Sequence, residues 1–115
     1  MDKAKRLSKR KHVIYFSEVH DKDNKLFNGH LTDISKSGLM LISEDKVEEG
    51  KLFRLEIILP EETEGRDKIN CKAKSIWCKR DVNPDYFATG FEIKEMDIID
   101  EELIEYLMYE YGFND

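Results

Sequence analysis

The sequence predicts an all-β fold, a sandwich or a barrel, followed by one C-terminal helix. Short runs rich in Ile, Leu, Val, Phe and Tyr recur along the chain, and clusters of Asp, Asn, Ser, Gly and Pro separate them. Short strands joined by turns have this pattern. Near the C-terminus, the apolar residues change from every second position to the spacing of a helix.

Three strands and two connections are expected in the first part of the chain. Each apolar run is short and is followed by residues that favour turns. The predicted elements are a strand over 13–19, a turn over 21–24, a strand over about 27–34, a tight connection over 35–38 and a strand over 39–43.

A fourth strand is predicted over 51–59, where apolar residues occupy alternate positions: Phe53, Leu55, Ile57 and Leu59. Pro60 is expected to end this strand, because proline has no N–H group to donate to a neighbouring strand. The charged run 61–68 is then expected to be a solvated loop.

The fifth and sixth strands are predicted over 69–79 and 86–93, joined by the turn-forming residues 80–85. In the fifth strand, Cys71 and Trp77 both fall on the odd-numbered face, and Cys78 falls on the other. We therefore expect Cys71 to be a small buried side chain and Trp77 to belong to the core rather than to form a stacking platform. The two thiols should not meet unless a bulge alters this alternation.

The C-terminal helix is predicted over about 97–111. Asp97 or Asp100 can serve as its N-cap and Gly112 as its C-cap. We expect its apolar stripe to pack on the strands, with a dimer contact as the alternative. The stripe consists of Leu103, Ile104, Leu107, Met108 and Tyr111.

The composition is that of one soluble globular domain. The chain has 115 residues, of which 40% are hydrophobic and 38% are charged. Its apolar runs are too short to span a membrane, and no secretion signal is recognisable. Two cysteines do not form a disulfide framework. We therefore expect a cytoplasmic protein with no membrane insertion.

The charge is unevenly distributed between a basic N-terminal arm, residues 1–12, and an acidic body, residues 13–115. The arm holds six basic residues and one acidic residue, a net charge of +5, whereas the body holds 13 basic and 24 acidic residues, a net charge of −11. A nucleic-acid binder would spread its positive charge over a folded face, so this pattern makes nucleic acid an unlikely partner. It suits a compact anion better.

No catalytic constellation is recognisable, so we do not expect an enzyme. The three histidines have no metal-ligand spacing with the cysteines, and neither a metal nor another cofactor is predicted. The pairs of acidic residues fall in predicted loops or at the helix start, where solvation or the helix dipole accounts for them.

Two short motifs carry recognisable chemistry: Arg6-x-x-x-Arg10 in the arm, and Asp33-x-Ser35-x-x-Gly38 between two predicted strands. Arginine matches the guanine edge, stacks on bases and pairs with phosphates. A carboxylate at position 33 can accept hydrogen bonds from guanine, the Ser35 hydroxyl can bond base or phosphate, and a glycine permits close approach. The structural alternative is that Asp33 and Ser35 only bond backbone amides in a turn, with Gly38 supplying a positive φ.

In these two motifs, their order and their place relative to the strands, the sequence resembles the PilZ family of bacterial cyclic di-GMP receptors. Weaker likenesses are the strand that ends in Leu59-Pro60, Ile76-Trp77 in the next strand, and the run 90–93 before the closing helix. The resemblance implies a six-stranded antiparallel β-barrel with a flexible arm that folds over the ligand. It also implies a set of ligand-binding residues: Arg6, Arg10, Asp33, Ser35 and Gly38.

The function implied by this resemblance is that of a stand-alone adaptor that binds cyclic di-GMP and signals to a separate effector protein. Motility, adhesion or exopolysaccharide machinery are the usual effectors of the family, and the sequence does not choose among them. Lys5 precedes the first arginine and leaves open whether one or two ligand molecules bind. The alternatives are a PilZ-like interaction module that binds no nucleotide and docks through residues 103–111, and a small nucleic-acid-binding barrel.

Replacing Arg6 or Arg10 by Ala should weaken cyclic di-GMP binding by roughly 2 to 4 kcal/mol, because each change removes a charged hydrogen-bond donor from the ligand. Both residues precede the first predicted strand, so the melting temperature should not change. Calorimetric titration and thermal melts of the two variants test this expectation. Unchanged affinity in either variant would remove that arginine from the site.

Overall fold

The computed structural model describes residues 17–63 and 65–111, with side chains placed except at 60–63, 107, 110 and 111. The arm with Arg6 and Arg10, residues 13–16 of the first predicted strand, and Gly112 lie outside the described residues. The described elements are β1 Glu18–Asp21, β2 Asn28–Ile34, β3 Gly38–Ser43, β4 Leu52–Thr63, β5 Arg66–Arg80, β6 Phe87–Glu95 and α2 Ile98–Tyr111.

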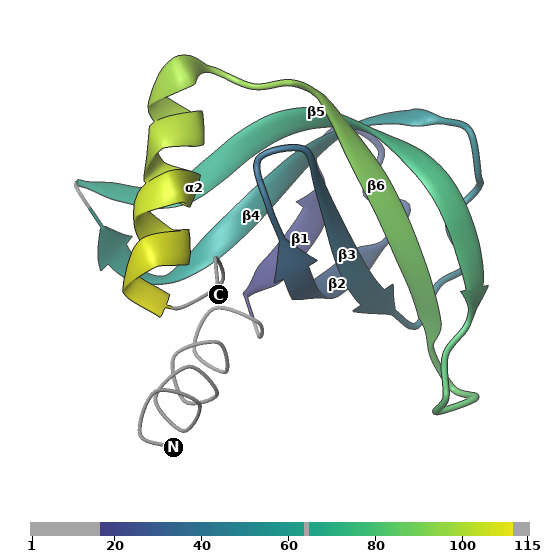
Figure 1. Cartoon of the computed structure of the whole chain (residues 1–115). Coiled ribbons are helices and arrows are strands. Elements are labelled where there is room, and N and C mark those ends of the chain that lie inside the picture. The colour runs from purple at the N-terminus through teal and green to yellow at the C-terminus, as the bar shows by residue number, and fades with distance from the viewer. Residues whose placement is uncertain (1–16, 64, 112–115) are drawn as a thin grey trace.

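The six strands form a closed barrel in the order β1-β2-β3-β6-β5-β4 (Figure 1). All neighbouring strands are antiparallel, and β1 closes the barrel by pairing with both β2 and β4. Closure gives each of the six described strands a hydrogen-bonded neighbour on both sides. The predicted all-β fold and the six-stranded antiparallel barrel are both confirmed.

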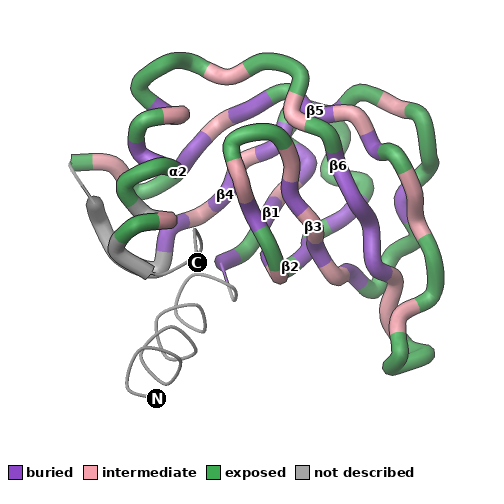
Figure 2. The backbone as a smooth tube through the Cα atoms, viewed as in Figure 1, coloured by how far each residue is buried: buried purple, intermediate pink, exposed green. Residues whose placement is uncertain are grey.

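The core fills the inside of the barrel, and buried and exposed residues alternate along the strands (Figure 2). The predicted alternation in β4 is confirmed, since Phe53, Leu55 and Ile57 are all buried. The rings of Phe27, Phe53 and Phe91 meet inside the barrel, with centroids 5.2 to 6.1 Å apart. Aromatic pairs at this separation add to the stabilisation from area burial.

The helix α2 packs on the barrel through Leu103 and Ile104, which belong to the buried core. The backbone N–H of Glu101 donates to the Asp97 carbonyl over 2.9 Å, so Asp97 is the N-cap and not Asp100. Asp100 is instead buried, pairs with Arg66 and accepts a hydrogen bond from the backbone N–H of Asn70 in β5. At 14 residues α2 is too short to cross a bilayer, and the described chain holds no other helix that could.

The first described turn agrees with the sequence. β1 ends at Asp21, whose buried carboxylate accepts hydrogen bonds from the backbone N–H groups of Asn24 and Leu26 over 3.4 and 3.1 Å. Such a bond from an Asp side chain to the backbone ahead stabilises a turn. The turn over 21–24 is therefore confirmed.

The prediction that Pro60 ends the fourth strand is wrong, because β4 continues to Thr63 and β5 begins at Arg66. Ile58 pairs with Lys68 and Thr63 with Arg66, so β4 has extra residues between these two pairs. Proline is tolerated in such an irregular stretch, where the missing N–H removes no regular ladder bond. Most of the expected loop 61–68 is consequently strand.

The expectation that Trp77 belongs to the core is also wrong. Ser75 pairs with Phe91 and Trp77 pairs with Gly90, which leaves Ile76 as an extra residue in β5. This bulge reverses the alternation that holds from Ile69 to Ser75. Trp77 is consequently only half-buried and lies on the outer face, whereas Cys78 packs against the core.

Both cysteines are free thiols, and Cys71 is buried as predicted. Burial, with a contribution from the negative charge of Asp100, raises the pKa of Cys71 from 9.0 to about 12. Since the folded pKa is raised, the stability contributed by this thiol is complete below about pH 9 and is lost as the pH rises toward about 12.

Cys71 should therefore resist alkylation in the folded protein, because the thiolate is the reactive species. A Cys78→Ser variant leaves Cys71 as the only thiol, and we expect iodoacetamide to modify it at mildly alkaline pH only after denaturant is added. Mass spectrometry measures the extent of modification. Rapid labelling of the folded variant would show that the thiol is accessible and ionised.

Candidate ligand-binding site on the outer face of the barrel

The turn between β2 and β3 carries the Asp-x-Ser-x-x-Gly motif and is closed by its own hydrogen bonds. The Ser35 backbone N–H donates to the Gly38 carbonyl over 2.8 Å, and the Ser35 hydroxyl accepts from the backbone N–H groups of Ser37 and Gly38, each over 3.3 Å. One oxygen of Asp33 accepts from the backbone N–H of Ile34 over 2.9 Å. Asp33 and Ser35 thus form the backbone bonds of the structural alternative.

Gly38 does not supply a positive φ, because in the described chain only Gly50, Gly65 and Lys25 have one. Its role is close packing instead. A Cβ atom at position 38 would lie 2.7 Å from the carbonyl oxygen of Phe91 in β6, which is nearer than real Cβ contacts come. The glycine therefore allows β3 to approach β6 beside the turn.

A bulge in β2 turns Asp33 to the outside of the barrel. Leu31 pairs with Leu41 and Asp33 pairs with Met40, so Thr32 is an extra residue. The Thr32 hydroxyl donates to the Met40 carbonyl over 3.1 Å across this irregularity. As a result Asp33 is exposed and the next residue, Ile34, is buried.

Trp77 reaches the same outer face from β5 and lies on a glycine of β6. A Cβ atom built on Gly90 would lie 2.4 Å from two atoms of the indole ring. No side chain at position 90 could share this space with the ring in its present position. The glycine therefore lets the ring lie against the strand backbone.

These residues form one row across four strands. Asp33 pairs with Met40, Met40 with Gly90, and Gly90 with Trp77, so the row runs from β2 through β3 and β6 to β5. The row and the nearby turn line a cavity of about 330 Å³. Its lining residues are Asp33, Ser35, Gly38, Leu39, Met40, Ile76, Trp77, Gly90 and Phe91.

The structure therefore brings together three of the residues predicted to bind ligand, Asp33, Ser35 and Gly38. It leaves Arg6 and Arg10 outside the described residues. Sequence reasoning missed the Trp77 face of the cavity. The glycine inside the sixth strand, at position 90, was the available signal, because such a glycine often marks a close approach.

The chemistry of the cavity is that of hydrogen-bond acceptors beside an aromatic face. Among its described lining residues, Asp33 is the only charged group. One oxygen of Asp33 bonds to Ile34, while the side chain remains exposed and can accept further bonds. The Lys79 ammonium lies 5.1 Å from the Trp77 ring centroid.

The turn also touches α2, which lies beside the β2–β3 hairpin (Figure 1). The Lys36 ammonium, between Ser35 and Ser37 in the chain, pairs with the Glu105 carboxylate of α2 over 3.1 Å. The Ser37 carbonyl accepts from the backbone N–H of Ile93 over 2.9 Å. The motif that lines the cavity is thus linked to β6 and to the C-terminal helix.

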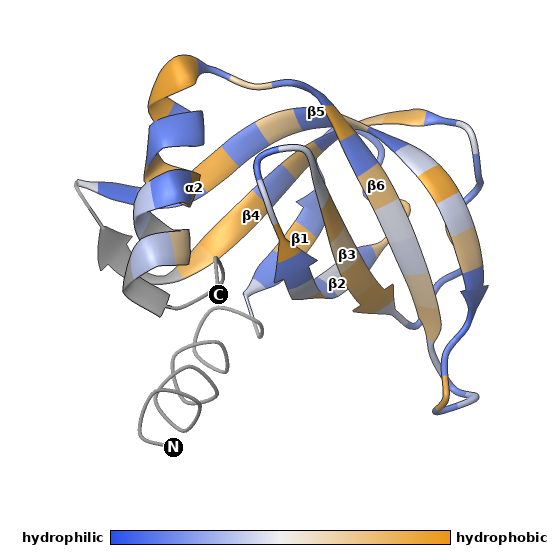
Figure 3. Ribbon diagram, viewed as in Figure 1, coloured by the Kyte–Doolittle hydropathy of each residue, from blue (hydrophilic) through white to orange (hydrophobic). Residues whose placement is uncertain are grey.

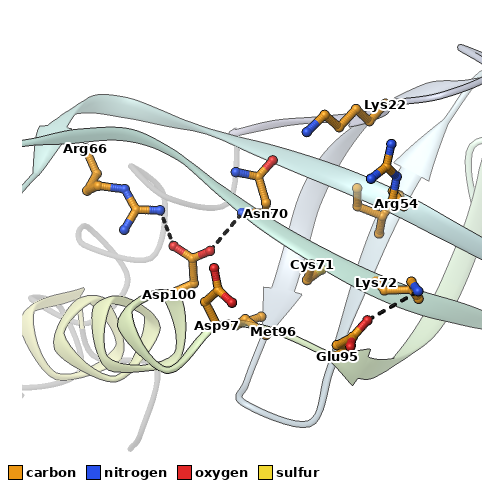
Figure 4. A pocket seen from close by; sticks show the side chains of 11 residues that line it. Lys22, Arg54, Arg66, Asn70, Cys71, Lys72, Glu95, Met96, Asp97 and Asp100 are labelled. Carbon is orange, nitrogen blue, oxygen red and sulfur yellow. Dashed lines mark hydrogen bonds and ion pairs between the residues drawn. The ribbon is translucent and has the colours of Figure 1, made fainter.

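A second concavity, of about 380 Å³, lies between β5, the end of β6 and the start of α2 (Figure 4). Of the four described cations that line it, the three besides Lys22 are paired: Arg66 with Asp100, Lys72 with Glu95, and Arg54 with Asp23. The Arg54 guanidinium lowers the pKa of Asp23 through a hydrogen bond, and Asp23 raises the pKa of Arg54. With these charges neutralised, the second concavity is a poorer site for an anion.

Comparison with known proteins agrees with the barrel fold. A family model for the PilZ domain matches residues 4–110. The chain belongs to the PilZ domain family. PilZ domains are receptor or adaptor modules.

Two solved structures share the fold of this PilZ domain. The Bacillus subtilis inhibitor of motility (MotI/DgrA) superposes with a TM-score of 0.69 at 20% identity, over 86% of this chain and 47% of that one. The PilZ domain of YcgR from Escherichia coli, solved with c-di-GMP, gives a TM-score of 0.61 at 17% identity, over 90% and 85%. This chain therefore spans about half of the MotI/DgrA chain. No curated protein matches the sequence.

The contact between Trp77 and Gly90 predicts a spectroscopic change. Trp77 is the only tryptophan of the chain, so its fluorescence reports on the cavity alone. Gly90→Ala should push the ring off the strand and shift its emission to longer wavelength as water reaches the indole. Val82→Ala, at a position 98% exposed, is the matched control and should leave the spectrum unchanged. An unchanged Gly90→Ala spectrum would mean that the ring does not lie on this glycine.

Proposed function

We propose that this PilZ domain is a cyclic di-GMP receptor that passes its ligand-bound state to a partner protein. The observation that carries the proposal is a cavity that is lined both by residues of the family motif and by an aromatic ring. Asp33 and Ser35 of the family motif line it together with Trp77, in a chain whose family consists of receptor and adaptor modules.

In this proposal the cavity holds one guanine of the ligand. The available oxygen of Asp33 accepts hydrogen bonds from the guanine N1 and N2 hydrogens, and the Ser35 hydroxyl bonds the base or a phosphate. The half-buried Trp77 ring offers a flat face on which the base can stack. A volume of about 330 Å³ is at the lower end for ligand sites, so it suits one base rather than the whole dinucleotide.

The phosphates need cations that the described lining of the cavity does not provide. Arg6 and Arg10 are proposed to supply them from the basic arm, since arginine pairs with phosphate oxygens and stacks on bases. The arm and the barrel would then hold the ligand between them. Such a rearrangement of the arm is the conformational signal of the proposed adaptor, which needs no catalytic step.

Two other functions remain as competitors: an interaction module that binds no nucleotide, and a barrel that binds RNA or DNA through the arm. The net charge of −11 on residues 13–115 weighs against a polyanionic partner. The presence of Asp33 and Ser35 in one cavity with an aromatic face weighs against a module without a ligand.

Calorimetric titration of the full chain tests the proposal. Cyclic di-GMP should bind, and cyclic di-AMP should bind more weakly by about 1 to 3 kcal/mol per contacted base, since adenine lacks the N1 and N2 donors that Asp33 accepts. Asp33→Ala should lose about 1 to 3 kcal/mol of cyclic di-GMP affinity, because it leaves guanine donors unpaired in a partly dehydrated site. Ser37→Ala should keep the affinity.

Ser37 is the matched control because it lies in the same turn, is exposed and contributes its backbone carbonyl to β6. Circular dichroism establishes that both variants fold. Equal losses for Asp33→Ala and Ser37→Ala would assign Asp33 a purely structural role. Binding of single-stranded RNA in place of the dinucleotide would favour the nucleic-acid competitor.

A further inference from the structure

One side of α2 exposes apolar and aromatic side chains to solvent. Ile99 is 62% exposed, Tyr106 is 43% exposed and Tyr109 is 73% exposed. Together with the exposed Glu102, they follow one another at intervals of three, four and three residues, which places them on one side of a helix. We call Ile99, Glu102, Tyr106 and Tyr109 the α2 surface.

The α2 surface borders a hollow of about 350 Å³ lined by Arg66, Ile99, Glu102, Leu103 and Tyr106. Leu103 is buried and belongs to the barrel core, so apolar atoms reach from the core to the exposed stripe. α2 begins with the exposed apolar residues Ile98 and Ile99, and Figure 3 shows this start of the helix as apolar. A row of exposed apolar side chains beside a hollow can bind the apolar face of an amphipathic helix from another protein.

The charge of α2 is strongly negative. Residues 98–111 contain five acidic residues, Asp100, Glu101, Glu102, Glu105 and Glu110, and no Lys or Arg. Arg66 pairs with the buried Asp100 and Lys36 pairs with Glu105, so these two cations offset two of the five charges and leave a net charge of −3. A cationic partner would therefore be attracted to this helix, and its Lys or Arg side chains could also lie on the exposed tyrosine rings.

We propose that the α2 surface binds a basic amphipathic helix of the effector protein. This inference rests on the proposed adaptor function and specifies the chemistry of its partner. The chain's own arm is a poorer occupant than an effector helix, because Met1 and Leu7 are its only large apolar side chains.

The position of the α2 surface beside the ligand turn gives it a route to the ligand. Glu105, which neighbours Tyr106 on α2, pairs with Lys36 of the turn that contains Ser35. Both side chains are more than half exposed, so the pair contributes little to stability and can exchange partners. An effector helix on the α2 surface would lie next to the turn whose Ser35 lines the ligand cavity.

Two labelled peptides of identical Lys and Leu composition serve as probes. In one, Leu recurs at helical spacing with Lys between; in the other, the order is scrambled. By fluorescence anisotropy with the full chain, the amphipathic peptide should bind about tenfold or more tightly than the scrambled one. Ile99→Ser, Tyr109→Ser and Glu102→Lys should each weaken its binding about tenfold. Val82→Ser, at an even more exposed apolar position on the β5–β6 connection, should not.

Equal binding of the two peptides, or equal binding by wild type and the α2 variants, would overturn the inference. So would a wild-type dimer that Ile99→Ser dissociates, since a second copy would then be the occupant. Tighter peptide binding after Lys3, Lys9 and Lys11 are changed to Glu would also overturn it, by showing that the arm covers the surface.

Titration of the same proteins with cyclic di-GMP separates this inference from the proposed function. Variants that keep cyclic di-GMP affinity and lose the peptide support the α2 surface as a distinct partner site. If wild type binds cyclic di-GMP but not the amphipathic peptide, the inference alone fails. If it binds the peptide but not cyclic di-GMP, the proposed receptor function fails while the peptide-binding surface stands.

Discussion

The architecture of the candidate site depends on the two-residue alternation of side chains in a closed barrel and on two places where that alternation is reset. In a closed barrel each strand has one inward and one outward face. The extra residues Thr32 in β2 and Ile76 in β5 exchange these faces. Asp33 and Trp77 consequently point outward on strands that are distant in sequence. Gly38 allows β3 to approach β6, Gly90 leaves room for the Trp77 ring on β6, and both Asp33 and Trp77 line one cavity.

In the β2–β3 turn, the same side chains stabilise the turn and line the cavity. The Ser35 hydroxyl closes the turn through backbone N–H groups while it lines the cavity, and Asp33 uses one carboxylate oxygen locally and keeps capacity for further bonds. A structural role and a binding role for these residues are therefore compatible. The backbone bonds orient the side chains in advance, which lowers the entropic cost of binding a ligand there.

The sequence was sufficient to predict the strands and the helix whose positions follow from the spacing of apolar residues. The alternation of apolar residues predicted β4, and the change to helical spacing predicted α2. The N-cap, Asp97, was one of the two residues proposed for it. Two predictions were wrong, that Trp77 belongs to the core and that Pro60 ends β4. Both errors arise at irregularities in strand pairing, which depend on the residues of the partner strand. The assembly of Asp33, Ser35 and Gly38 into one cavity followed the motif. The arginines Arg6 and Arg10 stay a prediction, since they lie outside the described residues.

The row from Asp33 to Trp77 crosses four neighbouring strands, and a ligand held along it would join segments from both halves of the chain. Such a ligand acts as a reversible cross-link of the barrel. At a free concentration of about 100 times Kd, a ligand specific for the folded state adds about 2.7 kcal/mol to its stability. Proteases degrade the unfolded state, so the lifetime of the protein in the cell would rise and fall with the concentration of its own signal.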